Sequence, residues 1–271
     1  MKKLLLTFAL VAGLIVSASN ADAIQISLDV SSLGLGSGDG VTQLFDEFAF
    51  NSQTTSTDFD GIPGGAFTDV GNVRITDFNA ATSTDQEGIN TAWTLTAVWT
   101  DLSGTSTVIG PGSLDYTYTS GTMKIYAAAG VPNNFDGDGD LLFEGADDDT
   151  GFTTGTEIAS LSLISGSGFV RPTPLGLTGA SKLFWQFDTM ETGIWKDEFG
   201  NDLKDSIPLV LAIADANMNN LTSGGPGVLW SDQNGSVAIN NTVSPTIPEP
   251  ATMLLFGSGL IGFIAKRKKR A

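Results

Sequence analysis

Side chains able to bind a metal ion gather in one glycine-rich turn. Four oxygen-bearing residues occupy alternate positions there: Asn134, Asp136, Asp138 and Asp140. Calcium takes about six to eight oxygen ligands, so a turn of this composition suits it. An EF-hand is excluded, because Gly145 stands where that motif ends in glutamate. We expect either a calcium-binding turn in a β domain, completed by Glu144 or by the acidic residues 147–149, or a solvated acidic loop.

The residues for most catalytic devices are missing. The chain contains no histidine and no cysteine, which excludes Ser-His-Asp and Cys-His nucleophiles and imidazole metal ligands. Glu191, Asp197 and Glu198 lie close together in the sequence and could supply a glycosidase acid pair. Because the chain has 30 acidic residues, closeness in the sequence does not by itself distinguish a catalytic pair from ordinary surface acids. We expect no enzymatic activity.

Five tryptophans could stack on sugar rings. Trp93, Trp99 and Trp185 stand at alternate positions of apolar stretches, which favours packing in a core. Trp195 and Trp230 lie nearer to turns, and we expect these two to be the surface aromatics.

Apolar residues alternate with polar ones in short runs, as in residues 24–30, 93–99, 159–163 and 183–187. Clusters of glycine, asparagine, aspartate and proline separate the runs, and no long helical period is present. This pattern predicts an all-β fold, with residues 24–240 forming a single β-sandwich or jelly-roll-like domain.

Two local features of this domain can be predicted more closely. Leu114, Tyr116 and Tyr118 alternate before Ser120-Gly121, and a second alternating run follows over residues 123–127. This arrangement predicts a hairpin that turns at Ser120-Gly121. The stretch Asn51–Thr57 is rich in serine and threonine, which predicts a polar loop or, alternatively, a glycosylated segment.

The two ends of the chain read as export signals. Residues 1–23 combine Lys2 and Lys3, an apolar run and the sequence Ala-Asp-Ala, which is typical of a cleaved signal peptide. A polar linker follows the β domain over residues 241–250. Residues 251–271 form an apolar segment with a basic tail, which predicts a single membrane span whose end stays in the cytoplasm: Lys266, Arg267, Lys268, Lys269 and Arg270.

Residues 24–250 are strongly acidic once the signals are set aside. They hold six of the 13 basic residues and 29 of the 30 acidic residues, which gives a net charge of −23. A protein of this charge repels nucleic acids and anionic lipids. It suits cations or a hydrated polymer as partners.

Pro248-Glu249-Pro250 stands directly before the apolar segment. Both prolines fix the backbone and lack an amide proton, so they keep this peptide extended, as a protease cleft requires. The motif, the short glycine-bearing span and the basic tail occur in order at the C-terminus and together resemble the PEP-CTERM sorting domain. The resemblance implies brief anchoring in the inner membrane, facing the periplasm. An exosortase then cleaves the signal and releases the protein to the cell surface or matrix.

The β domain is itself similar to flocculation-associated members of this group, through the stretches 67–78 and 93–101 and the acidic run near Asp136. That similarity implies a role in cell aggregation within an exopolysaccharide matrix. The alternative hypothesis is a discrete carbohydrate-binding module, with or without calcium.

Protein recovered from outside the cell should lack the apolar segment, because a sorting signal of this kind is removed after export. Mass spectrometry of the extracellular fraction is therefore expected to find no peptide spanning Thr252 to Lys266. Abundant detection of that peptide would instead mean that the segment is a permanent anchor.

Overall fold

The computed structural model describes residues 24–58, 65–79, 87–130, 151–174, 176–207 and 210–241. These residues belong to one compact unit, Asp22–Asn241. They form eleven strands and two 3-10 turns, η1 (Ser31–Leu33) and η2 (Leu203–Ser206). In this part of the chain no helix has the length and apolar character needed to cross a membrane.

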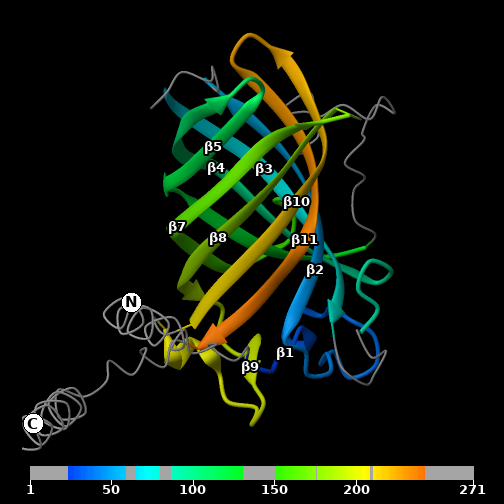
Figure 1. Ribbon diagram of the computed structural model, residues 1–271. Coiled ribbons are helices and arrows are strands. Elements are labelled where there is room, and N and C mark those ends of the chain that lie inside the picture. The colour runs from blue at the N-terminus through cyan, green and yellow to red at the C-terminus, as the bar shows by residue number, and fades with distance from the viewer. Residues whose placement is uncertain are drawn as a thin grey trace, which may run out of the picture. The chain divides into compact units, whose positions relative to one another are not determined.

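Nine strands form the main sheet. They are β2 (Glu47–Thr57), β3 (Gly65–Asn79), β4 (Trp93–Gly110), β5 (Ser113–Ser120), β6 (Thr122–Ala129), β7 (Thr156–Thr173), β8 (Gly176–Met190), β10 (Val210–Gly225) and β11 (Val228–Asn241). All neighbouring strands in this sheet are antiparallel (Figure 1).

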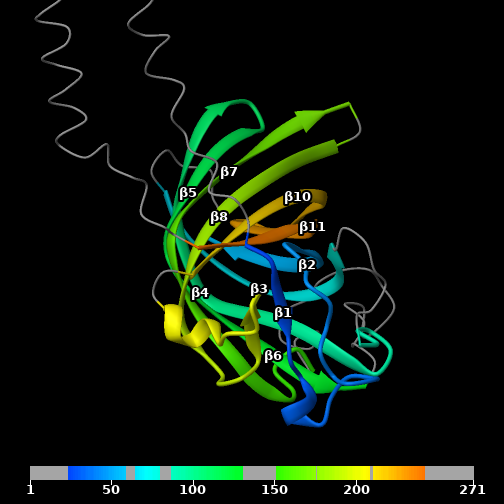
Figure 2. The same ribbon diagram turned by 90° about the horizontal axis from the view of Figure 1, so that it is seen from below.

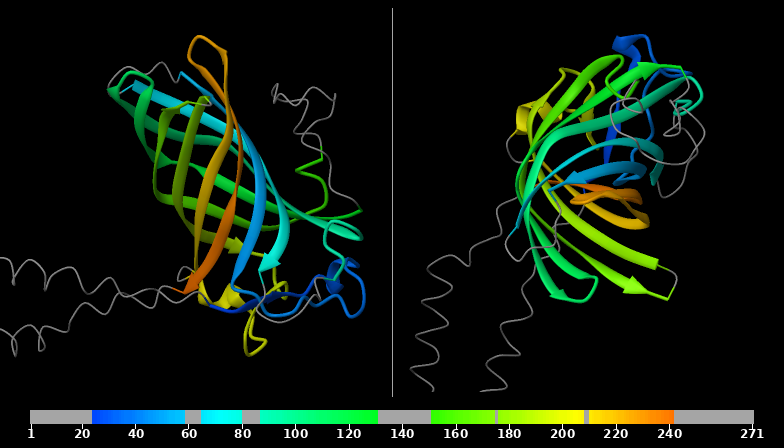
Figure 3. Two further views of the ribbon diagram at one scale, coloured as in Figure 1. Left: turned by 45° about the vertical axis from the view of Figure 1, so that its right-hand side comes forward. Right: turned by 90° about the horizontal axis from the view of Figure 1, so that it is seen from above.

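The main sheet closes on itself. Its first strand, β2, pairs with β3 on one side and with the last strand, β11, on the other, from Glu47 opposite Ala238 to Ser56 opposite Leu229. β5 and β6 lie one after the other between β4 and β7, so the nine strands fill eight positions around the ring. Views from below and from above show the strands following one another around the interior (Figures 2 and 3).

The prediction of a single all-β domain is confirmed. Within this class the layers come from one closed sheet rather than from the two separate sheets of a sandwich or jelly roll. Strands of up to 18 residues, such as β4 and β7, carry enough twist to curl the sheet until its ends meet.

The predicted hairpin at Ser120-Gly121 is wrong. Both β5 and β6 pair antiparallel with β4, so the chain continues in one direction through Gly121. A Cβ atom at Gly121 would lie 2.6 Å from Leu102 Cδ1, so glycine serves close packing at this position. The chain reverses instead at Pro111-Gly112, between β4 and β5, where Gly112 has a φ of 67°.

The predicted polar loop Asn51–Thr57 is the second half of β2. Ser52, Thr54 and Ser56 alternate along it and are buried inside the closed sheet. Serine and threonine here fill inward positions of a strand, a placement that a reading of the segment as polar surface could not anticipate.

A two-stranded sheet of β1 (Ile26–Leu28) and β9 (Trp195–Asp197) lies at the lower end of the closed sheet in Figure 1. Trp195 is fully buried, and its Nε1 donates a hydrogen bond of 2.9 Å to the carbonyl of Ile158. Its ring meets those of Phe48 and Phe187 edge to face. The prediction that Trp195 is a surface aromatic is therefore wrong, because its indole is buried at this end of the interior of the closed sheet.

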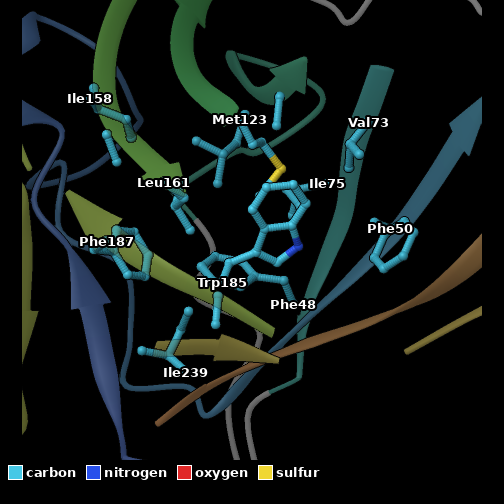
Figure 4. Packing of buried hydrophobic residues seen from close by; sticks show 14 of the residues in the cluster. Phe48, Phe50, Val73, Ile75, Met123, Ile158, Leu161, Trp185, Phe187 and Ile239 are labelled. Carbon is cyan, nitrogen blue, oxygen red and sulfur yellow. The ribbon is translucent and has the colours of Figure 1, made fainter. Parts of the chain in front are cut away.

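Large side chains from opposite walls meet inside the sheet. Figure 4 shows Trp185 at the centre of this packing, with Leu161 and Phe187 beside it. Trp93, Trp99 and Trp185 are all buried, which confirms their prediction as core residues, whereas Trp230 is half-buried.

One inward glycine makes room for an indole. A Cβ atom at Gly71 would lie 2.6 Å from Cζ2 of Trp99 and 2.7 Å from the carbonyl oxygen of Gln53. The Trp99 ring therefore packs directly against the backbone of β3, and no larger residue fits between them.

Replacing Gly71 with alanine should destabilise the domain by about 1–3 kcal/mol, because the added methyl group forces the Trp99 ring away from β3. Urea unfolding measures the change. Gly110→Ala is the matched control, since the nearest atom to a Cβ there lies 4.0 Å away. Equal effects of the two substitutions would contradict this account of Gly71.

Candidate functional site

A cavity of about 70 Å³ lies inside the closed sheet. Its walls come from all the strand positions of the ring, and Trp195 faces it from the capped end. Most of the lining is apolar, and Figure 4 shows several of these side chains: Phe48, Phe50, Val73, Ile75, Met123, Leu161, Trp185, Phe187 and Ile239.

One wall of the cavity is polar. Ser52 and Thr54 of β2 stand directly opposite Gln233 and Ser231 of β11. The hydroxyls of Thr54 and Ser231 are hydrogen-bonded at 2.7 Å, and Gln233 Nε2 donates to both, at 3.2 and 3.0 Å. Ser52, Thr54 and Gln233 line the cavity, so a hydrogen-bonding strip faces a mainly apolar space, to which Thr96 and Ser181 add two further hydroxyls.

A buried carboxylate network stands beside this cavity. Asp69 of β3 accepts hydrogen bonds from Trp99 Nε1 at 2.6 Å, from the Ser56 hydroxyl at 2.8 Å and from the Tyr118 hydroxyl at 3.3 Å. Trp99 and Tyr118 also line the cavity, so both aromatic side chains join the network to the apolar space. The network ties β2, β3, β4 and β5 together through side chains.

Burial controls the protonation of this network. Loss of solvation raises the pKa of Asp69 to about 6 and outweighs the hydrogen bonds from Trp99, Ser56 and Tyr118, which lower it. Burial and the charge of Asp69 raise the pKa of Tyr118 well above its ordinary value, so this phenol stays a donor. Above a pH of about 6 the interior therefore holds a negative charge, which the hydrogen bonds from Trp99, Ser56 and Tyr118 stabilise.

The outer face of the sheet carries many polar side chains, although apolar ones such as Ile109, Ile164 and Phe169 are also exposed. Hydroxyl side chains pair across neighbouring strands, as in Thr57–Thr68, Thr105–Thr117 and Ser160–Thr189. Three basic side chains of this face are each held by an acid: Lys124 by Glu157, Arg171 by Asp115 and Lys182 by Asp215. Much of the positive charge of the domain is therefore already neutralised by its own residues.

The predicted calcium ligands all lie outside the described residues: Asn134, Asp136, Asp138, Asp140 and Glu144. The same is true of Pro248, Glu249 and Pro250 and of the basic tail. Within the described ranges, no three acidic side chains come together as a metal site would require. The calcium turn thus stays a prediction.

Of the acids considered for glycoside hydrolysis, Asp197 has a structural role. Its carboxylate accepts hydrogen bonds from the backbone amides of Phe199 and Asn201, at 2.9 and 2.8 Å, and from Asn201 Nδ2 at 2.9 Å. Slight desolvation raises the pKa of Asp197, but these hydrogen bonds prevail and lower it. The carboxylate therefore stays ionised and closes the turn after β9.

Comparison with known families decides the nature of the C-terminus. Residues 246–270 match the PEP-CTERM protein-sorting motif. The chain carries a PEP-CTERM sorting domain. A PEP-CTERM signal marks an exported protein with a C-terminal membrane-anchoring segment that an exosortase processes. The resemblance of Pro248-Glu249-Pro250 and the residues after it to this domain is thus confirmed.

The other comparisons add little to this PEP-CTERM assignment. No curated protein matches the chain. Among solved structures, Ail, the attachment invasion locus protein of Yersinia pestis, is 9% identical with a TM-score of 0.14, covering 72% of this chain and 98% of its own. The same protein in complex with the heparin analogue sucrose octasulfate is 10% identical with a TM-score of 0.13, at the same coverage. Scores this low support no argument about fold or function.

Sequence reasoning missed both polar groups of the interior. Asp69 falls in the alternating series Phe67, Asp69, Gly71 and Val73, and Ser52 follows Phe48 and Phe50 in the same way. A polar residue that continues an apolar series of period two was the available signal, because it marks an inward position.

The raised pKa of Asp69 predicts a pH dependence of stability. The folded state binds the proton more tightly than the unfolded chain, so stability falls as pH rises from about 4 to about 6 and is level above that range. The shift corresponds to about 3 kcal/mol. Asp69→Asn should abolish this component.

Urea unfolding of both proteins between pH 3.5 and 7.5 measures the difference. A free-energy difference between the proteins that stays constant over this range would contradict the buried titration of Asp69.

Proposed function

We propose that this exported protein acts outside the cell as a non-catalytic matrix protein, which promotes cell aggregation together with exopolysaccharide. The PEP-CTERM domain supports the route: the protein crosses the inner membrane, is held by its C-terminal segment and is then processed by an exosortase. The step from export to aggregation rests on the chemistry of the described outer face.

The observation that carries the proposal is the combination of hydroxyl-rich strands with an acidic surface. Hydroxyl pairs such as Thr105–Thr117 and Ser160–Thr189 present donors and acceptors that match those of sugar hydroxyls. The pairs lie on different parts of the sheet, between β4 and β5 and between β7 and β8, so such groups are not confined to one spot of the outer face.

Charge determines which polymers this face can meet. The net charge of residues 24–250 is −23, and Lys124, Arg171 and Lys182 are engaged in ion pairs. An anionic polymer is therefore repelled unless divalent cations bridge the two surfaces, whereas a neutral polymer is not. Calcium in the turn at Asn134–Asp140 would serve the same bridging chemistry.

No catalytic step is part of the proposal. Histidine and cysteine are lacking from the sequence, and Asp197, one of the acids considered for hydrolysis, is engaged in closing a turn. The buried Asp69 faces donors of its own network.

Deletion of the gene should reduce floc or biofilm cohesion and leave the yield of exopolysaccharide unchanged. A settling assay measures cohesion, with complementation by the full chain and by a chain that ends before Ile247. The full chain should restore settling and the shortened chain should not, because it lacks the sorting signal. Chelation of divalent ions should weaken aggregation more in the parent than in the deletion strain.

A deletion strain that settles as fast as its parent, with unchanged chelator sensitivity, would rule out this function. Saturable binding of the purified protein to one sugar class at micromolar affinity would then favour the discrete carbohydrate-binding module.

A further inference from the structure

The polar strip on β2 and β11 contains a hydroxyl group whose hydrogen bonds are not made within the described part of the protein. Ser52 is 2% exposed and lines the cavity, and its Oγ has no hydrogen-bond partner among the described residues. Its neighbours Thr54 and Ser231 are bonded to each other and to Gln233. An unpaired buried hydroxyl opposes folding, and alanine at this position would avoid the penalty. The hydroxyl therefore points to something bound in the cavity.

The space beside this hydroxyl is kept open by small side chains. The inward row of β10 consists of Ala212, Ala214 and Ala216, and all three line the cavity. β10 pairs directly with β11, so the alanine row lies next to the polar strip. Leucine or valine on this row would fill the space, as it does elsewhere in the core.

The chemistry of the lining defines the occupant. The cavity of about 70 Å³ exceeds the roughly 10–15 Å³ that one water molecule needs. It is smaller than the roughly 300 Å³ of a drug-sized pocket. No described lining residue carries a charge, so a charged molecule would lose its hydration without gaining a counter-ion. The hydroxyls of Thr96 and Ser181 also line the cavity, but neither lacks a hydrogen-bond partner, and Thr96 donates to the carbonyl of Phe152. Ser52 is then the lining hydroxyl to be satisfied, which requires one hydrogen-bonding function on an otherwise apolar body.

We propose that the interior of the closed sheet binds a small, neutral, mainly apolar molecule with one hydroxyl group, of the size of a simple alcohol or phenol. The hydroxyl of the ligand meets Ser52 Oγ and the Gln233 amide on the polar strip. Its apolar body lies against the alanine row of β10 and the ring of Trp185. This site is independent of the outer face on which the proposed matrix function rests.

Two groups of side chains bound the site. Trp195 blocks the capped end, and the Asp69 network holds Trp99 and Tyr118 in place beside the cavity. Entry past Trp195 would therefore require local opening of the cap.

The test compares phenol with benzene, which has the same ring without the hydroxyl. Each compound is titrated into the ¹⁵N-labelled exported protein, and the indole N–H signals of the tryptophans are followed by NMR. Phenol should shift the signals of Trp99 and Trp185 saturably and should bind more tightly than benzene. The signal of Trp230, at an outward position of β11, should not move.

Three variants locate the contact. Ser52→Ala should weaken phenol binding about three- to tenfold, the loss expected for one hydrogen bond, and should leave benzene binding unchanged. Ser160→Ala, which removes a hydroxyl from the outer face, is the matched control and should change neither. Ala212→Leu should fill the cavity and abolish binding of both compounds.

Benzene binding to Ser52→Ala shows that this variant retains the folded cavity. The proposal is overturned if phenol shifts neither Trp99 nor Trp185, which would leave a cavity that holds only water. It is also overturned if the wild-type protein binds phenol no more tightly than benzene, or if Ser52→Ala binds phenol as tightly as the wild type.

Discussion

The pairing of β2 with β11 is the constraint on which the rest of this structure depends. It joins strands that are about 170 to 190 residues apart in the sequence (Ser56 opposite Leu229 and Glu47 opposite Ala238, for example) and turns a curled sheet into a closed one. Closure encloses a narrow interior that inward side chains must fill. The ring of Trp99 on β4 fits this interior because Gly71 faces it, and Gly104 likewise leaves room for the ring of Phe67. The core is thus a consequence of closure, and its composition follows from the width of the ring.

Closure also separates two polar environments. Outside, serine and threonine pair across strands and acids outnumber bases. Inside, polar groups include the Asp69 network, the strip around Ser52 and the hydroxyls of Thr96 and Ser181. Each buried polar group is costly unless it is paired. Asp69 meets this requirement with three donors from its own chain, whereas Ser52 does not.

Several strands, such as those around Trp93–Trp99 and Leu183–Phe187, could be predicted from the sequence because alternation is a local property. Trp93, Trp99 and Trp185 read as core residues for the same reason. Ring closure could not be predicted, since it depends on a pairing between distant strands that no local pattern encodes. The prediction of a hairpin at Ser120-Gly121 failed because glycine occurs at sites of tight packing as well as in turns, and only the contact with Leu102 distinguishes the two. The prediction that Trp195 lies on the surface failed because closeness to a turn in the sequence does not show whether that segment folds back over the interior. The Asp69 network was hidden for a related reason, since its donors come from three different strands.

The closed sheet limits how copies of this protein can associate. Proteins with an open sheet edge can join by adding one backbone strand to another, which is the basis of donor-strand complexes and of many fibrous assemblies. Among the described residues, each strand of the main sheet already has a neighbour on both sides. Copies that met at this sheet would therefore touch through side chains rather than by adding a backbone strand to it. Side-chain contacts exchange as their surroundings change, so an assembly built on them could disperse again more readily than one joined by a shared backbone ladder.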